Sequence, residues 1–238
     1  SKEIIKKLYV DEDKNAIIVI PGIAGTRLFA NSDMDAKDYL LPEFNESKHN
    51  KYSYNAGHQF WEPETSKGTQ KLASATYYQN EIQSEVMMLI CDAMGNSLAD
   101  IRPETSYENA QYGAQNTYTK LVNDLEYEFG DEYCVDFFSY DWRKDVSEAA
   151  KSLETYIEKH EYDSVILVCH SMGGLVASKY LANSEQNQDK VDKLITIGTP
   201  YLGAPKALYV FETGALLDNL RTTFCMGTPI KAIANNLT

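Results

Sequence analysis

The stretch VILVCHSMGGLVASKYL, residues 165–181, changes its character at Ser171. Before the serine, residues 165–169 are apolar and mostly β-branched, as is typical of a strand that a parallel sheet buries on both faces. After the serine, Leu175, Val176 and Tyr180 have a spacing that suits a packed helix better than a strand. The stretch therefore predicts a strand that turns into a helix at a single serine.

Strand and helix candidates alternate along much of the chain. Residues 16–20, AIIVI, are an apolar run that ends at Pro21 and Gly22, which indicates a buried strand followed by a tight loop. Asp145 is placed to cap a helix, with Glu148 three residues later. The other candidates are strands at residues 134–138 and 193–197 and helices at residues 118–129, ended by Gly130, and 146–157. This alternation predicts the α/β fold class, with a parallel sheet and right-handed crossovers.

Residues 31–115 differ from the rest of the chain. They are polar and rich in tyrosine, and Asn, Ser and Gly recur throughout them. Residues 77–91 are a candidate helix, although their apolar period is irregular. A chain of 238 residues suits one sizeable α/β domain. We therefore expect a single domain over residues 1–238, with residues 31–115 as an insertion.

The composition excludes several classes of function. Lys and Arg number 22 against 35 Asp and Glu, so the net charge of -13 opposes binding to a nucleic-acid backbone. The four cysteines, Cys91, Cys134, Cys169 and Cys225, form no CxxC or Cys/His cluster, and neither a zinc site nor a disulfide framework is predicted. Nothing predicts a cofactor. We find no apolar run long enough to span a bilayer and no signal peptide, and the compartment stays open.

Ser171 is predicted to lie where a parallel sheet binds its ligands, at the carboxyl end of a strand. The pattern around it, C-H-S-M-G, departs from the G-x-S-x-G nucleophile elbow only at Cys169, a small residue that the strained turn can tolerate. Gly173 and Gly174 let the helix approach the sheet closely. The alternative interpretation is that Ser171 is an ordinary helix N-cap.

Acyl transfer needs two backbone N–H donors for the developing oxyanion. The residue after the nucleophile supplies one by position, here Met172, and the loop after an earlier strand supplies the other, for which Ile23 in PGIAG is the candidate. The alternative is that PGIAG is a plain turn. His170 is adjacent to Ser171 and is expected to point to a different side, so we predict a structural, hydrogen-bonded histidine and not the general base.

Four blocks in this order resemble the lecithin:cholesterol acyltransferase family, which includes lysosomal phospholipase A2 and phospholipid:diacylglycerol acyltransferases. They are PGIAGTRL, FFSYDWRKDVSEAAKSLETYIE, VILVCHSMGGLVASKYL and ITIGTPYLGAP. The resemblance runs from about residue 16 to about residue 205, and residues 31–115 stand in the position of the family's cap and lid region. It implies an α/β-hydrolase core.

The resemblance also implies a site and a chemistry. Ser171 is its nucleophile, and the amides of Met172 and Ile23 are its oxyanion hole. The implied substrate is a lipid ester, and the acyl-serine passes its acyl group to water or to an alcohol. Trp61 either contacts lipid from the lid or anchors the insertion, and residues 140–143 are expected to be scaffold. Transient contact with a membrane or lipid surface and the oligomeric state are left open.

The triad order of α/β-hydrolases is Ser, then Asp or Glu, then His. All four histidines, His49, His58, His160 and His170, precede Ser171, so no acid or base is assigned. Three explanations stay open. In the first, which we expect, the chain is C-terminally incomplete and nearly inactive as isolated, since loss of the triad histidine costs about a millionfold in kcat. In the second, His49 or His58 serves as base. In the third, the protein is a catalytically silent lipid- or partner-binding module.

Overall fold

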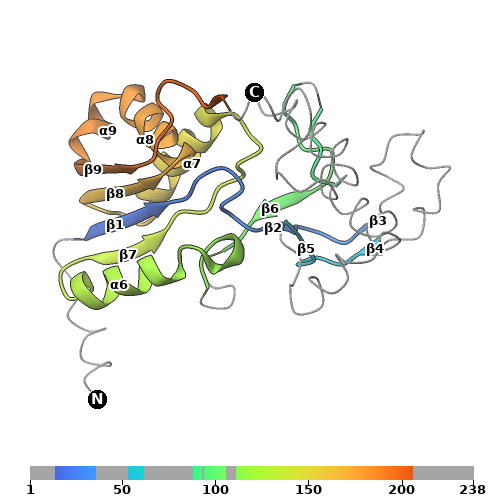
Figure 1. The fold of residues 1–238 in the computed structure, drawn as a ribbon, viewed down its shortest axis with the longest axis horizontal. Helices are drawn as coiled ribbons and strands as arrows, with labels where there is room; N and C mark the ends of the chain where they lie inside the picture. The colour runs from blue at the N-terminus through green and yellow to red at the C-terminus, as the bar shows by residue number, and fades with distance from the viewer. Residues whose placement is uncertain (1–13, 36–52, 62–87, 93, 106–110, 206–238) are drawn as a thin grey trace, which may run out of the picture.

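The computed structural model describes residues 14–35, 53–61, 88–92, 94–105 and 111–205. Its central feature is a parallel sheet of four strands in the order β7-β1-β8-β9 (Figure 1). The strands are β1 (Asn15–Ile20), β7 (Cys134–Phe137), β8 (Ser164–His170) and β9 (Val191–Ile197). The α/β fold class and the four strand candidates are thus confirmed, and the sheet with its helices is of partial α/β-hydrolase type.

Helices cover both faces of this sheet (Figure 1). They are α6 (Thr119–Phe129) on one face, α7 (Val146–Lys159) and α8 (Met172–Asn183) on the other, and the short α9 (Glu185–Asp189) after α8. The Asp145 carboxylate accepts a hydrogen bond from the Ser147 amide at 2.7 Å, so the predicted cap of α7 is confirmed. Gly130 is the C-cap of α6, as its position in the sequence predicts.

Strand β1 shows why both faces of the sheet are apolar. Ala16, Ile18 and Ile20 belong to the buried cluster under α7 and α8, whereas Ile17 and Val19 belong to the cluster under α6. Successive side chains of a strand point to opposite faces, so a strand covered on both faces needs a continuous apolar run. The run AIIVI meets this need in the middle of the sheet.

The described part of the chain between β1 and α6 contains two small antiparallel sheets. The first has the order β5-β2-β6, and the second pairs β3 with β4. Their strands are β2 (Leu28–Ala30), β3 (Met34–Asp35), β4 (Ser53–Tyr54), β5 (Gln59–Trp61) and β6 (Ile101–Pro103). Leu28, Tyr54 and Phe60 share one buried cluster with the central sheet, so the described part of residues 31–115 packs on the core. Its action as a lid and the single-domain organisation stay predictions.

The helix expected over residues 77–91 is not formed at residues 88–91, where the chain makes a turn and Cys91 bridges to Ser97. Asp92 explains the difference, because its carboxylate accepts hydrogen bonds from the amides of Met94 and Asn96, both at 2.8 Å. Such bonds favour a turn over a helix. Residues 77–87 lie outside the described residues. None of the described helices combines the length and apolar character that crossing a membrane requires.

Candidate active site at the end of strand β8

Ser171 joins β8 to α8 in a strained backbone conformation. Its φ is 51° and its ψ is -123°, and its side chain makes no cap hydrogen bond. A serine that caps a helix normally has extended backbone angles and accepts a hydrogen bond from the first turn. The N-cap interpretation therefore does not describe Ser171. A residue other than glycine in this region costs about 1–3 kcal/mol, and such strain is concentrated at functional sites.

Close packing holds this elbow in place. The Ser171 amide donates to the Ile197 carbonyl at 2.9 Å, which attaches the turn to the end of β9. A Cβ atom on Gly173 would lie 2.5 Å from the Ile20 carbonyl oxygen, and one on Gly174 would lie 2.1 Å from Thr199 Oγ1. The prediction that both glycines permit a close approach of the helix is confirmed.

Cys169, the departure from the usual motif, lies fully buried in the core. Burial raises the pKa of its thiol to about 12. It therefore stays a neutral thiol at physiological pH and acts as a small core side chain, as the sequence predicts.

The loop after β1 lies directly against the serine. A Cβ atom on Gly22 would lie 2.8 Å from Ser171 Cβ and 3.3 Å from Ser171 Oγ, so only glycine fits at this contact. Ile23 follows, with 48% of its surface exposed. Within the part of the chain that the structure describes, neither the Ile23 amide nor the Met172 amide donates a hydrogen bond. No described residue therefore accepts a hydrogen bond from either candidate oxyanion donor.

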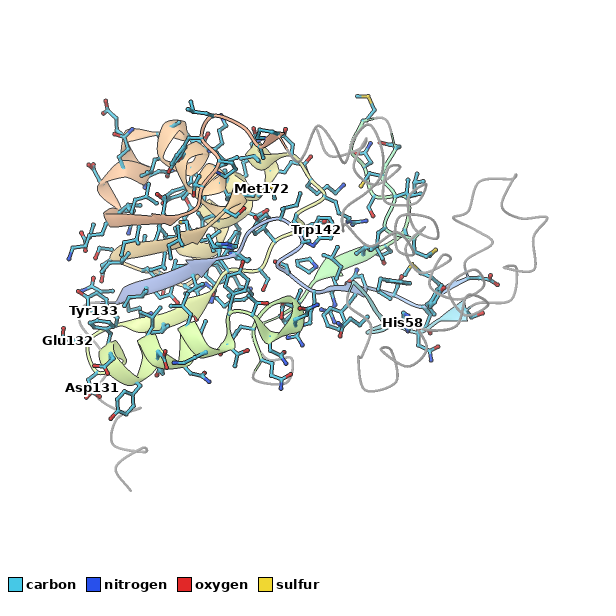
Figure 2. All side chains as sticks on the ribbon, in the orientation of Figure 1. His58, Asp131, Glu132, Tyr133, Trp142 and Met172 are labelled. Carbon is cyan, nitrogen blue, oxygen red and sulfur yellow. The ribbon has the colours of Figure 1, made fainter. Side chains whose placement is uncertain are left out.

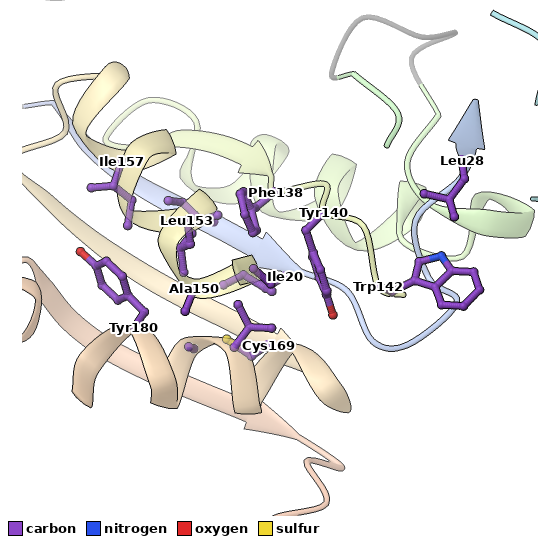
Figure 3. Close-up of a cluster of buried hydrophobic side chains, with 14 of the residues drawn as sticks. Ile20, Leu28, Phe138, Tyr140, Trp142, Ala150, Leu153, Ile157, Cys169 and Tyr180 are labelled. Carbon is purple, nitrogen blue, oxygen red and sulfur yellow. The ribbon is translucent and has the colours of Figure 1, made fainter. Parts of the chain in front are cut away.

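Residues 140–143 anchor this loop, as their expected scaffold role requires (Figure 3). Tyr140 Oη donates to the Pro21 carbonyl at 2.9 Å, and Trp142 Nε1 donates to the Thr26 carbonyl at 3.0 Å. Buried Arg143 forms an ion pair with Asp141 at 2.6 Å. The two aromatic side chains thus hold both ends of the segment that carries Ile23.

A buried ion pair of Arg27 with Glu104, which the sequence reasoning missed, provides a second anchor. Arg27 Nη2 lies 2.6 Å from Glu104 Oε2, and the Arg27 amide donates to Oε1 at 2.9 Å. Burial raises the pKa of the Glu104 carboxyl, and the hydrogen bonds and charge of Arg27 oppose that rise. Arg27 follows the conspicuous PGIAG segment, but Glu104 lies 77 positions away in a polar region, and no sequence signal connects the two.

His170 is hydrogen-bonded away from the nucleophile. Its Nδ1 lies 2.8 Å from Tyr118 Oη, and the same hydroxyl accepts a hydrogen bond from the Gly22 amide at 3.0 Å. This agrees with the predicted structural role of His170. The sequence reasoning did not assign Tyr118 to the site. It used this residue only as part of the apolar face of the helix predicted at residues 118–129.

Neither of the other two histidines in the described residues, His58 and His160, completes the site. His160 Nδ1 contacts the Tyr156 carbonyl at the end of α7, and Figure 2 shows His58 among the small strands, far from Met172. His49 lies outside the described residues. Ser171 Oγ has no hydrogen bond to a histidine among the residues that are described.

The remaining expectations for the site concern Trp61 and metals. The backbone of Trp61 belongs to β5, but its side chain lies outside what the structure describes, so neither proposed role of this tryptophan is tested. The described residues contain no group of three or more His, Cys, Asp or Glu side chains arranged to hold a metal ion.

A serine in a strained turn between a parallel strand and a helix is the arrangement that α/β-hydrolases use for their nucleophile. The model of the lecithin:cholesterol acyltransferase family matches residues 104–226, which is more than half of the 238-residue chain. The chain therefore belongs to the lecithin:cholesterol acyltransferase family. A search of curated proteins found no match. Family membership suggests acyl transfer or ester hydrolysis on lipid substrates.

Proposed function

We propose that this protein is a serine acyl hydrolase or acyltransferase that acts on lipid esters through an acyl-serine intermediate. The strained backbone of Ser171 carries the proposal, because this conformation presents a hydroxyl at the carboxyl edge of the sheet and has no use in capping α8. The amino-terminal end of α8 adds a positive electrostatic potential beside that hydroxyl.

The proposed chemistry has two steps. Ser171 Oγ attacks the ester carbonyl carbon while its proton passes to a general base, and the amides of Ile23 and Met172 donate to the oxyanion that forms. The bond to the leaving alcohol then breaks, and that alcohol takes a proton. In the second step, water or an acceptor alcohol attacks the acyl-serine and regenerates the serine hydroxyl. We assign neither the base nor its acidic partner to a described residue.

An exposed apolar side chain beside Ser171 supports a lipid substrate. Ile23 follows Gly22, the residue that lies against the serine, and is 48% exposed. Such a side chain can contact acyl chains or the surface of a lipid aggregate.

A fluorophosphonate probe with intact-mass analysis tests the proposal. In protein that contains its catalytic acid and base, we expect one adduct, the same adduct on Ser178→Ala, and none on Ser171→Ala. Ser178 is a matched control because it also lies in α8, where its hydroxyl donates to the Gly174 carbonyl. The absence of an adduct on the unchanged protein, or its persistence in Ser171→Ala, would contradict the proposal. The first of these outcomes would favour a catalytically silent lipid- or partner-binding module.

Product analysis separates hydrolysis from transfer. Phosphatidylcholine vesicles that contain a long-chain alcohol would be incubated with the protein, and free fatty acid and new ester would be quantified. Both products should disappear in Ser171→Ala, because both reactions pass through the same acyl-serine. A product that forms equally in Ser171→Ala would show that this serine is not the nucleophile.

A further inference from the structure

One peptide unit in the loop after β1 is held at both of its polar atoms by tyrosine hydroxyls. Tyr140 Oη donates to the Pro21 carbonyl at 2.9 Å, and the Gly22 amide donates to Tyr118 Oη at 3.0 Å. The carbonyl and the amide belong to the same Pro21–Gly22 peptide bond. Tyr118 immediately precedes α6, whereas Tyr140 follows β7, so the two hydroxyls reach this unit from separate elements.

This peptide unit directly precedes the amide of Ile23, the proposed oxyanion donor. The proline ring fixes φ of Pro21, so the plane of the unit turns mainly through ψ of Pro21 and φ of Gly22. Glycine resists such a rotation of the peptide plane less than any other residue. The Ile23 amide belongs to the next peptide unit, whose Gly22 carbonyl accepts a hydrogen bond from the Gly25 amide at 3.0 Å. A rotation of the Pro21–Gly22 unit that the dihedral angles of Gly22 do not compensate would move this next unit with its amide, and it would break both hydrogen bonds to the tyrosines. The two hydroxyls therefore supply the restraint that Gly22 itself lacks.

The same hydroxyl of Tyr118 connects the loop to the nucleophile. It lies 2.8 Å from Nδ1 of His170, the residue before Ser171. Because the hydroxyl already accepts from the Gly22 amide, its own proton is available for donation to Nδ1 of a neutral histidine. One tyrosine thus joins the strand end that carries Ser171 to the loop that carries Ile23.

Both tyrosines are buried, which strengthens these restraints. Tyr118 is 6% and Tyr140 2% exposed, and burial raises the pKa of each hydroxyl, so both stay protonated at neutral pH. The Tyr118 ring packs closely on Gly113, where a Cβ atom would lie 2.5 Å from the ring carbon Cδ2. Water does not readily replace a hydrogen bond in such surroundings, so a lost hydroxyl leaves its partner unsatisfied.

We propose that Tyr118 and Tyr140 are positioning residues that fix the direction of the Ile23 amide toward the oxyanion at Ser171. This inference rests on the proposed acyl-transfer function. Neither tyrosine is proposed to touch the substrate. Each acts through the Pro21–Gly22 peptide unit, so the loss of either hydroxyl should weaken stabilisation of the transition state more than binding of the substrate.

The test uses protein that contains its catalytic acid and base, and it measures kcat and KM for p-nitrophenyl butyrate in Tyr118→Phe, Tyr140→Phe and the double variant. Loss of one oxyanion donor costs about 100- to 1,000-fold in kcat, and a donor that is only misdirected should cost less. We expect each single variant to lower kcat by about 10- to 100-fold while KM changes less than threefold. The double variant should lose less than the product of the single losses, because both hydroxyls hold the same peptide unit.

Tyr162→Phe is the matched control. It also removes a hydroxyl from a buried tyrosine, one that donates to the Asp136 carboxylate away from the loop. This variant should lose stability without a specific loss of kcat. Ser171-dependent activity that keeps its kcat in Tyr118→Phe and Tyr140→Phe would overturn the positioning role alone. Activity that does not depend on Ser171, or none in the unchanged protein, would overturn the proposed function and this inference with it.

Discussion

Replacing Ser171 with glycine should make the protein more stable than replacing it with alanine. Both variants lack Oγ, so their comparison isolates the effect of Cβ on a backbone with φ 51° and ψ -123°. Holding an alanine in this conformation costs about 1–3 kcal/mol, a strain that glycine avoids. Glycine is freer in the unfolded chain, however, and this lowers the stability of the glycine variant by about 0.5–1 kcal/mol. The expected net difference in the free energy of unfolding is about 1 kcal/mol in favour of glycine.

Urea unfolding followed by circular dichroism measures this difference directly. In thermal melts it corresponds to about 2–4 °C for a chain of this size. Both variants should show the same dependence on urea concentration, since the surface exposed on unfolding is unchanged. Neither should react with a fluorophosphonate probe if Ser171 is the nucleophile.

The same pair of substitutions at Ser178 provides the control, with the opposite sign. Ser178 lies inside α8 and is not among the described residues with positive φ. There glycine should be about 1 kcal/mol less stable than alanine, as in any helix interior. If the Ser171 pair followed the Ser178 pair, the backbone at Ser171 would not be strained, and the main support for the nucleophile elbow would be lost.

Three further predictions concern packing, charge and thiol reactivity. Gly174→Ala should lower the free energy of unfolding by about 1–3 kcal/mol, measured in urea, because its Cβ would lie 2.1 Å from Thr199 Oγ1; Thr199→Ala should restore much of the loss. Glu104→Gln should cost about 3 kcal/mol, since it leaves a buried guanidinium without its counterion; a neutral effect in urea unfolding would show that the charge is dispensable. In the native protein at pH 8, Ellman's reagent should label exposed Cys134 long before Cys169, whose pKa of about 12 leaves almost no thiolate; equal rates would contradict the burial of Cys169.

Local sequence patterns account for most of the central fold. The apolar runs at residues 16–20 and 165–169 need cover on both faces, which is the condition inside a parallel sheet. Gly173 and Gly174 mark the close approach of α8, and the distances confirm that no larger side chain fits. These features depend on the residues' own shapes and spacing, so they are readable without a structure.

Residues 88–91 show where the helix expected over residues 77–91 does not form. Asp92 follows them, and its carboxylate accepts hydrogen bonds from the amides of Met94 and Asn96, which closes a turn. A side chain that competes for backbone donors can override an irregular apolar period.

By itself, the sequence determined the succession of β1, α6, β7, α7, β8, α8 and β9 along the chain, the position of Ser171 at the end of a buried strand, and the need for small residues around it. Only the tertiary structure decided the strained backbone angles of Ser171, the pairing of Arg27 with Glu104, and the two tyrosines at the Pro21–Gly22 peptide unit. The difference has a physical origin. Apolar periodicity and the change from strand to helix at Ser171 are patterns between neighbours in the chain. The ion pair and the tyrosine contacts instead join residues that are 77 to 119 positions apart and meet only when the sheet has formed.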